Sequence, residues 1–192
     1  MDDKMMDDIP VAYKKLKEAT DGVKFSMASD LQTGSLLKTL VASKPSGRIL
    51  ELGTGTGLAT SWIIDGMDDG TRLTTIDNNE LLLDIARVAL QDARVEFVLA
   101  DGYAWIKNYS GEQFDMIFAD AMPGKYDLFE ETIRLVKEGG FYVIDDMLPQ
   151  PNWPQGHSEK AESFIGELEK RNDVVFTKLN WSTGIIIVTK IK

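Results

Sequence analysis

A pair of adjacent carboxylates near the end of the chain is the first feature that could do chemistry. Asp145 and Asp146 close an apolar run and begin the segment DDMLPQPNWPQGH, which contains three prolines, a tryptophan and the only histidine. Adjacent carboxylates at the end of a buried strand repel each other unless a positive group lies nearby. Carboxylate oxygens are also hard ligands of the kind that divalent cations prefer. The pair therefore points to a bound cation, with a role in the loop or at the surface as the plain structural alternative.

The strongest single signal is the glycine-rich run ILELGTGTG, residues 49–57. An apolar stretch ends at Glu51 and Leu52, and alternating glycines then open a helical pattern. The glycines are Gly53, Gly55 and Gly57. Glycine permits a tight turn and lets a ligand approach the backbone closely. The dinucleotide fingerprint G-x-G-x-x-G would need a glycine at Leu58, so the run favours a nucleoside ligand without a pyrophosphate over a generic turn.

Acidic residues also end the next two apolar runs. Asp77 closes RLTTID, and it follows Gly57 by 77 − 57 = 20 residues. An acid at that distance would accept hydrogen bonds from the ribose hydroxyls of a nucleoside. Asp101, followed by Gly102, would accept a hydrogen bond from an adenine amino group. Each acid also precedes a helical pattern, so helix capping is the alternative for both.

Composition narrows the class of protein. The chain has 192 residues, of which 43% are hydrophobic and 27% charged, as expected for one globular domain. Cysteine is absent, which excludes disulfides and thiolate metal sites, and the net charge of −10 argues against nucleic-acid binding. We see no apolar run of about 18 residues that would span a membrane. The start MDDKMMDDIP lacks the pattern of a signal peptide, so we expect a cytoplasmic protein.

The elements that must position these residues alternate along the chain. We predict strands over residues 48–52, 72–77, 95–100, 114–119, 141–145, 174–179 and 184–189. We predict helices over residues 8–20, 31–43, 58–67, 79–90, 102–109, 126–137 and 158–170. Gly139-Gly140 would stop the sixth helix, and Ser158 would cap the seventh. The alternation predicts a parallel sheet covered on both faces, and the four residues 180–183 allow only an antiparallel hairpin at its end.

These segments, in this order, resemble the class I S-adenosylmethionine-dependent methyltransferases over roughly residues 27–190. The resemblance implies an α/β Rossmann-like three-layer sandwich with a seven-stranded, mostly parallel sheet of order 3-2-1-4-5-7-6, in which strand 7 is antiparallel. It implies a single domain, residues 1–192, with N-terminal helices (1–45) over the cofactor and a core of residues 46–192. The residues implied to bind S-adenosylmethionine are Glu51, Gly53, Thr54, Gly55, Gly57, Asp77, Asn78, Asp101, Gly102 and Asp120.

The fourth strand segment, FDMIFADAMPGKY, indicates which branch the chain resembles. It lacks the Asp/Asn-Pro-Pro-aromatic tetrad of enzymes that methylate amino groups of DNA bases. It resembles instead the catechol and caffeoyl-CoA O-methyltransferase group, which has an Asp at this strand end and a Tyr six residues later, here Asp120 and Tyr126 (126 − 120 = 6). That group also ends its fifth strand with a pair like Asp145-Asp146. The segment FSMASDLQTGSLL resembles the part of that group that roofs over the cofactor, through Met27 and residues 32–34.

Neighbouring strands four and five would end about 5 Å apart and bring Asp120, Asp145 and Asp146 together. We predict that they bind a divalent cation, Mg²⁺ or alternatively Ca²⁺ or Mn²⁺, which would bind the acceptor oxygen and lower its pKa. The alternative is that Asp120 contacts only the amino acid part of the cofactor, and that Asp146 caps the loop or faces solvent.

The residue that would accept the proton differs from the pattern of the catechol group. Those enzymes place a catalytic lysine three residues after the strand-four Asp, where this chain has Pro123. The remaining candidates are Lys125 and His157, and we favour His157 because its ordinary pKa of about 6.5 lies near working pH. A surface histidine without a role is the alternative. Trp153, in the proline-rich loop, would offer an apolar wall to a planar acceptor.

We therefore predict a methyltransferase that transfers the sulfonium methyl of S-adenosylmethionine to a small hydroxylated acceptor, aromatic ones included, with help from a divalent cation. Two alternatives stay open: a metal-independent methyltransferase with His157 as base, and a protein that binds S-adenosylmethionine without turnover. A nicotinamide-dependent dehydrogenase is disfavoured by Leu58. We expect neither a nucleic-acid nor a membrane partner, and a homodimer is compatible with the sequence.

Overall fold

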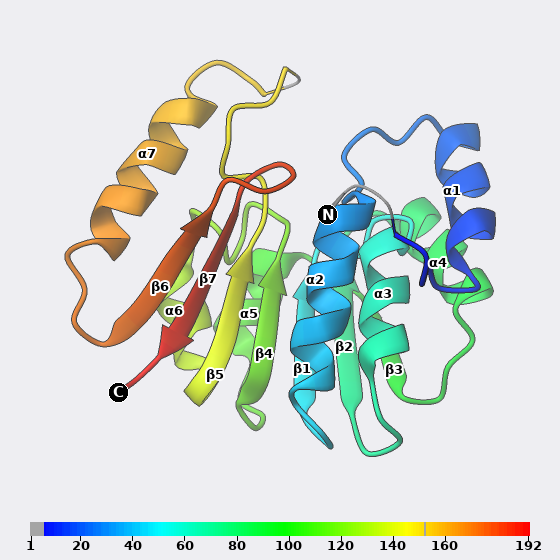
Figure 1. The fold of residues 1–192 in the computed structure, drawn as a ribbon, viewed down its shortest axis with the longest axis horizontal. Helices are drawn as coiled ribbons and strands as arrows, with labels where there is room; N and C mark the ends of the chain where they lie inside the picture. Colours follow the sequence, from blue (N-terminus) through cyan, green and yellow to red (C-terminus); the bar gives the residue numbers. More distant parts are fainter. Residues whose placement is uncertain (1–5, 152) are drawn as a thin grey trace.

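The computed structural model describes residues 6–151 and 153–192. The first five residues of the predicted N-terminal segment and Asn152 of the proline-rich loop lie outside the described residues. The described strands form one seven-stranded sheet of order β3-β2-β1-β4-β5-β7-β6 (Figure 1). Its strands are β1 (Arg48–Leu52), β2 (Arg72–Asp77), β3 (Val95–Leu99), β4 (Phe114–Ala119), β5 (Val136–Ile144), β6 (Val174–Leu179) and β7 (Ile185–Lys190).

The strand directions agree with the predicted topology. Strands β1 to β5 pair in parallel, and β7 pairs antiparallel with both β5 and β6. The short connection between β6 and β7 leaves no room for a parallel crossover. The predicted fold class and sheet order are therefore confirmed.

Helices flank the sheet on both sides. They are α1 (Tyr13–Gly22), α2 (Leu31–Ala42), α3 (Leu58–Gly66), α4 (Glu80–Ala89), α5 (Gly102–Asn108), α6 (Phe129–Arg134) and α7 (His157–Leu168). The first helix begins at Tyr13 and not at residue 8, since Pro10 disfavours helical backbone at the residue before it. Among the residues that the structure describes, no helix is long and apolar enough to cross a membrane.

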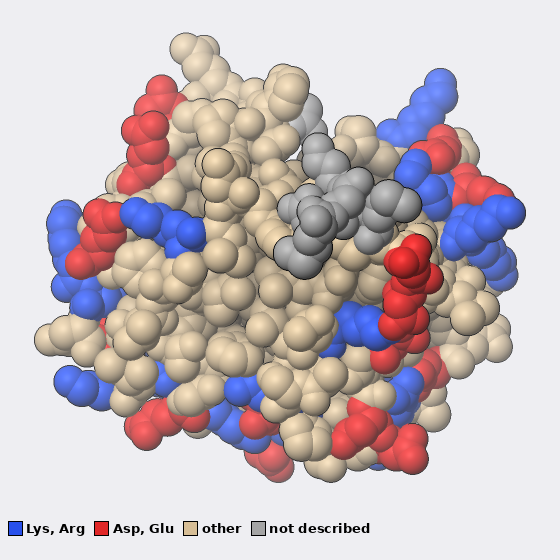
Figure 2. Space-filling model, viewed as in Figure 1, with Lys and Arg blue, Asp and Glu red and all other residues tan. Residues whose placement is uncertain are grey.

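The alternation of strand side chains divides the core into two clusters. Ile49 points to the face covered by α2 and α3, where Leu37 and Ile63 are fully buried. Leu50 points to the opposite face, where it joins a cluster that includes residues of α5, α6 and α7. This period of two is the expected geometry of a sheet buried on both faces. The side of the molecule seen in Figure 2 carries Lys and Arg together with Asp and Glu, largely around its edge.

The segment from β4 to β5 differs most from the prediction. The sixth helix spans only Phe129–Arg134, because Val136 already belongs to β5 and pairs with Phe114 of β4. The glycines at 139 and 140 lie inside β5, where the register shifts between Phe114 and Met116. A glycine pair suits such an irregularity, since Gly139 has a φ of 74°. The prediction that this pair ends a helix was wrong because burial of Val136 in the sheet outweighs local helical pattern.

The start of α7 was also predicted one residue too late. The N-cap is Gly156, with a φ of 85°, and His157 is the first helical residue. Ser158 therefore does not cap this helix. Other strand ends differ from the prediction by one residue, which is the usual uncertainty of element boundaries.

Two helical glycines provide a matched test of the packing between α2 and α3. A Cβ at Gly34 would lie 2.3 Å from the Trp62 ring, whereas a Cβ at Gly166 of α7 would meet nothing within 4 Å. We expect Gly34→Ala to lower the free energy of unfolding by about 1–3 kcal/mol through overpacking. Gly166→Ala should raise it by about 0.5–1 kcal/mol, because alanine favours the helix. Urea denaturation of both variants measures the contrast, and equal effects would contradict this packing.

Candidate active site

The residues that the sequence singled out gather at one edge of the sheet, where the parallel strands β1 to β5 end (the upper edge in Figure 1). In open α/β sheets, ligands bind outside this edge, at the point where the strand order reverses. Here β1 has β2 on one side and β4 on the other, so the reversal lies above β1. The glycine turn follows β1 directly.

The glycine turn has a backbone that disfavours other residues. Gly53, Gly55 and Gly57 have φ values of 101°, 52° and 91°. At Gly53 a Cβ would lie 2.6 Å from the carbonyl oxygen of Asp120, and at Gly57 it would lie 2.8 Å from the Cβ of Ala86. The turn is therefore held close to the end of β4 and to α4. Gly55 and Gly57 are buried, and a side chain at any of the three glycines would crowd the neighbouring groups.

Asp77 fastens this turn to β2. Its carboxylate accepts hydrogen bonds from the backbone N–H of Gly55 at 2.7 Å and of Asn79 at 2.8 Å. Helix capping, the alternative for Asp77, falls instead to Asn79, whose side chain accepts from Leu82 N–H. Asn78, next to Asp77, is exposed. Each Asp77 oxygen keeps a lone pair, so the carboxylate can also accept a ligand hydroxyl.

Asp101 does cap a helix. Its carboxylate accepts a hydrogen bond from Ala104 N–H at 2.8 Å at the start of α5. Gly102 approaches the loop after β4 closely, because a Cβ there would lie 2.8 Å from the Pro123 ring. A shallow hollow of about 530 Å³ runs along α5 past Asp101, but none of the other predicted donor-binding residues lines it. The predicted contact of Asp101 and Gly102 with adenine stays a prediction.

Glu51 lies inside the protein, with no exposed surface. Its Oε2 accepts hydrogen bonds from the hydroxyls of Thr60 at 2.6 Å and Thr75 at 2.5 Å. Thr75 has a single hydroxyl proton, so Thr54, at 2.6 Å, must donate to Thr75. Burial raises the pKa of Glu51 to about 7. Thr60 and Thr75 were not predicted from the sequence, although threonines are frequent near the glycine turn.

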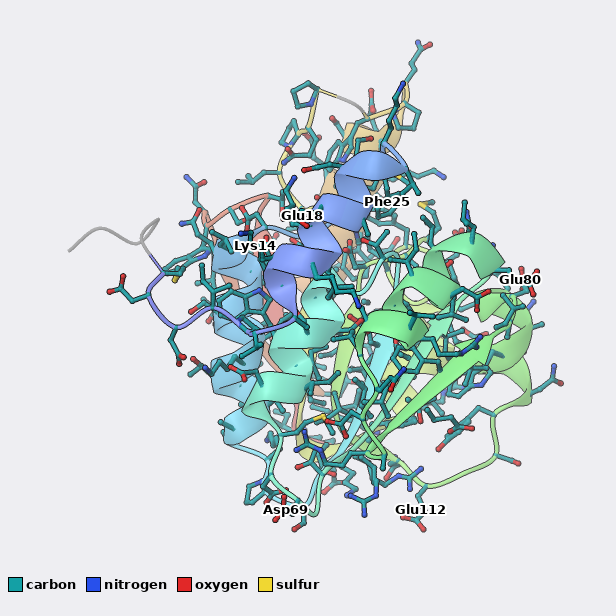
Figure 3. The ribbon with its side chains drawn as sticks, turned by 90° about the vertical axis from the view of Figure 1, so that its right-hand side faces the viewer. Lys14, Glu18, Phe25, Asp69, Glu80 and Glu112 are labelled. Atoms are coloured by element: carbon teal, nitrogen blue, oxygen red, sulfur yellow. The ribbon has the colours of Figure 1, made fainter. Side chains whose placement is uncertain are left out.

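The segment between α1 and α2 lies over the site. The ring of Phe25 stands 3.0 Å from where a Cβ of Gly55 would be, and the Ser29 hydroxyl donates to Asp120 at 3.1 Å. Figure 3 shows Phe25 at the end of α1, on the same side of the molecule as Glu80 at the start of α4. Met27, which carried part of the resemblance, is 66% exposed. The segment thus covers the glycine turn, as the resemblance implied for a roof.

Three carboxylates and one ammonium meet where β4 and β5 end. Asp145 is almost fully buried, and 11% of the Asp120 side chain is exposed. The Lys125 Nζ lies 3.7 Å from Asp120 and 3.9 Å from Asp146. Asp145 accepts hydrogen bonds from the Thr183 hydroxyl at 2.5 Å and from Asp146 N–H at 2.8 Å. Burial raises the pKa of Asp120 well above its ordinary range, the Asp145 charge raises it further, and the Lys125 ammonium opposes both.

The predicted cation site can be tested against this arrangement. Within residues 6–151 and 153–192, no group of three or more acidic, histidine or cysteine side chains is placed to hold a metal ion. The Lys125 ammonium stands beside Asp120 and Asp146, where a divalent ion bound to them would be repelled by it. As arranged, Asp120, Asp145 and Asp146 do not fit a divalent cation, and its binding remains an untested prediction.

His157, the favoured base, lies in an aromatic cluster. Its ring is 4.3 Å from the Trp153 ring and 5.1 Å from the Tyr126 ring, which it meets edge-on. Its Nε2 is buried and has no hydrogen-bond partner among the described residues. Burial lowers the pKa of His157, and the Lys125 ammonium lowers it further. The Asp146 charge opposes these effects, and the net lowering of the pKa favours the neutral imidazole that a base requires.

Comparison with known proteins agrees with this geometry. The family model described as O-methyltransferase matches residues 5–190. A catechol O-methyltransferase of Mycobacterium tuberculosis is 30% identical over 127 residues, which cover 64% of this chain and 58% of that protein. The chain spans about half the length of the curated relatives it matches.

Solved structures share the fold. The O-methyltransferase from Bacillus cereus in complex with SAH has a TM-score of 0.81 and 22% identity, and the match covers 97% of this chain and 93% of that one. The O-methyltransferase TomG from Streptomyces achromogenes in complex with SAM has a TM-score of 0.80 and 23% identity, covering 95% and 90%. Because the family model matches nearly the whole chain, the chain belongs to the O-methyltransferase family.

The buried Glu51 predicts a pH dependence of stability. Its pKa is about 7 in the folded protein against an ordinary 4.5, so between these values the folded state holds a proton that the unfolded chain has released. Wild-type stability should therefore fall as the pH rises through this window. Glu51→Gln, which cannot ionise, should lose this dependence, so its stability relative to wild type should rise by up to about 3 kcal/mol between pH 4.5 and pH 8. Urea unfolding at both pH values measures the difference; a difference that stays constant contradicts the raised pKa.

Proposed function

We propose that the protein is an S-adenosylmethionine-dependent methyltransferase that methylates an oxygen of a small hydroxylated molecule. The observation that carries this proposal is the left-handed glycine turn held to Asp77 by the 2.7 Å hydrogen bond from Gly55. Family membership supports the O-directed reaction, and two of the neighbouring structures are complexes with SAM and SAH.

In this proposal, the turn and its neighbours hold the donor. The backbone of Gly53, Thr54, Gly55 and Gly57 surrounds the methionine part, with Glu51 behind it as a buried support. Asp77 and Asn78 receive the ribose, Asp101 and Gly102 lie by the adenine, and Asp120 faces the amino acid end. The N-terminal part, residues 1–45, closes over the donor through Phe25 and Ser29, while residues 46–192 form the core of one domain.

Bound S-adenosylmethionine supplies a sulfonium methyl, which passes to the acceptor oxygen as the C–O bond forms and the C–S bond breaks with its electrons returning to sulfur. The protein aligns the two reactants and removes the acceptor proton. We assign that proton to His157, whose pKa is lowered by burial and by Lys125. Lys125 contributes positive charge near the developing oxyanion.

The acceptor side favours a small molecule with an apolar body. The rings of Tyr126 and Trp153 pack against His157, and the Met147 sulfur lies 3.9 Å from the Tyr126 hydroxyl. A flat hydroxylated ring would pack against these side chains. The divalent cation that the sequence predicts has no step in this proposal, since its donor set does not fit as arranged. The cytoplasmic location, the homodimer and the absence of nucleic-acid or membrane partners stay predictions.

The donor site is tested by calorimetry with S-adenosylmethionine. Asp77→Ala removes a charged hydrogen-bond acceptor and the anchor of the Gly55 N–H. We expect it to weaken donor binding by about 10- to 100-fold, the usual range for bonds to a charged group. Glu80→Ala is the matched control, because Glu80 is an exposed acid at the start of α4 and should leave affinity unchanged. Unchanged binding by Asp77→Ala, or a preference of the wild type for NAD, overturns the assignment.

Turnover is tested with a panel of catechols and other hydroxylated aromatics, by following S-adenosylhomocysteine release. We expect methylation at oxygen for at least one acceptor, with His157→Ala slower by about 10²- to 10⁴-fold, the range of general-base catalysis. Tight donor binding without transfer to any acceptor would favour the alternative of a binding protein without turnover.

A further inference from the structure

Lys125 is an unusual lysine in this chain. Only 5% of its surface is exposed, and its Nζ lies within 4 Å of two carboxylates, Asp120 and Asp146. Burying an ammonium is costly unless opposite charges accompany it. The other described ion pairs of lysines involve side chains that are more exposed, such as Lys137 with Asp115. Lys125 thus differs from these lysines in being buried beside the carboxylates at the ends of β4 and β5.

The loop after β4 is built to turn this side chain inward. Gly124 has a φ of 85°, and a Cβ there would lie 2.4 Å from Leu52 Cδ1, so only glycine lets the backbone pass so close to β1. The Gly124 N–H donates to the Asp127 carbonyl at 2.7 Å, and the Lys125 N–H donates to the Met122 carbonyl at 3.3 Å. This tight turn fixes Lys125 on the side of the loop that faces Asp120.

We infer that the Lys125 ammonium is the resident cation of this site and takes the place that the sequence assigned to a divalent ion. It offsets part of the negative charge of Asp120, Asp145 and Asp146. The neighbouring acids raise the pKa values of Asp120 and Asp145, and the Lys125 ammonium opposes this effect at both residues. A divalent ion would then face a fixed positive charge about 4 Å away, which opposes its binding. One consequence rests on the proposed function: methyl transfer would proceed without added metal.

The ammonium also bears on the class of acceptor. Its distances of 3.7 and 3.9 Å to Asp120 and Asp146 exceed hydrogen-bond length, so these contacts do not use its N–H groups. An ammonium can donate them to a single acceptor oxygen, but it offers no coordination positions for chelation. The site would therefore accept compounds with one hydroxyl and would not require two neighbouring hydroxyls.

Binding of Mn²⁺ alone, followed by electron paramagnetic resonance of the free ion, tests the inference without any turnover. We expect no stoichiometric binding to the wild type in the micromolar range. Lys125→Met keeps the apolar length of the side chain and removes its charge, so it should bind one Mn²⁺ per chain at least about tenfold more tightly than wild type. Lys125→Arg should behave as the wild type, because it keeps a positive charge.

Lys137→Met is the matched control, since it removes a lysine that pairs with Asp115 at 2.8 Å at the opposite edge of the same two strands. It should leave Mn²⁺ binding at the wild-type level. Tight stoichiometric Mn²⁺ binding by the wild type overturns the inference, and this result needs no variant to fold. Equal, weak binding by a folded Lys125→Met, verified by circular dichroism, overturns it as well.

The outcome is separable from that of the proposed function. The affinity for S-adenosylmethionine tests the proposed donor site, and the affinity for Mn²⁺ tests whether Lys125 takes the place of a metal ion. Either proposal can therefore be contradicted without the other. For an acceptor that is methylated, chelation with EDTA should change the wild-type rate by less than about twofold, and a larger loss would contradict the inference.

Discussion

Buried carboxylates at the edge of the sheet dominate the local structure, because each must be neutralised, hydrogen-bonded or protonated. Glu51 accepts two threonine hydroxyls and its pKa is raised to about 7. Asp145 accepts a hydrogen bond from the Thr183 hydroxyl in the connection between β6 and β7. Asp120 accepts a hydrogen bond from the Ser29 hydroxyl and lies beside the Lys125 ammonium. Polar residues from distant segments of the chain therefore lie together at the edge of the sheet where β1, β4 and β5 end.

Hydrogen bonds also join the N-terminal segment to the connection between β6 and β7 at the far end of the sheet. Ser29 reaches Asp120, while the Asp30 side chain caps α2 and also accepts from the Ser182 hydroxyl at 2.7 Å. Thr33 of α2 donates to Ser182 as well. The roof over the glycine turn is therefore held by the hairpin that closes the sheet. These hydrogen bonds join segments that are 152 residues apart in the chain at Asp30 and Ser182.

Family membership describes the fold of the whole chain, whereas the local geometry describes the loop after β4. The O-methyltransferase family model matches nearly the whole chain, and the solved neighbours share its fold. The loop after β4 departs from the pattern of the catechol group at Pro123, and the structure places Lys125 beside Asp120 through the turn at Gly124.

The sequence by itself determined the alternation of strands and helices, the closing hairpin, the glycine turn and the acids at the strand ends, because these depend on local periodicity and on short spacings. The order of the strands in the sheet was implied only by the resemblance to the methyltransferases, and the structure confirms it. The sequence left open whether Asp77 and Asp101 cap helices, and the structure gave that role to Asp101 and, beside Asp77, to Asn79. It misjudged Gly139-Gly140, because pairing of β5 with β4 overrides helical pattern. Only the tertiary structure decided that Lys125 stands among the carboxylates, since the distance between an ammonium and two strand ends is set by long-range packing and not by neighbours in the chain.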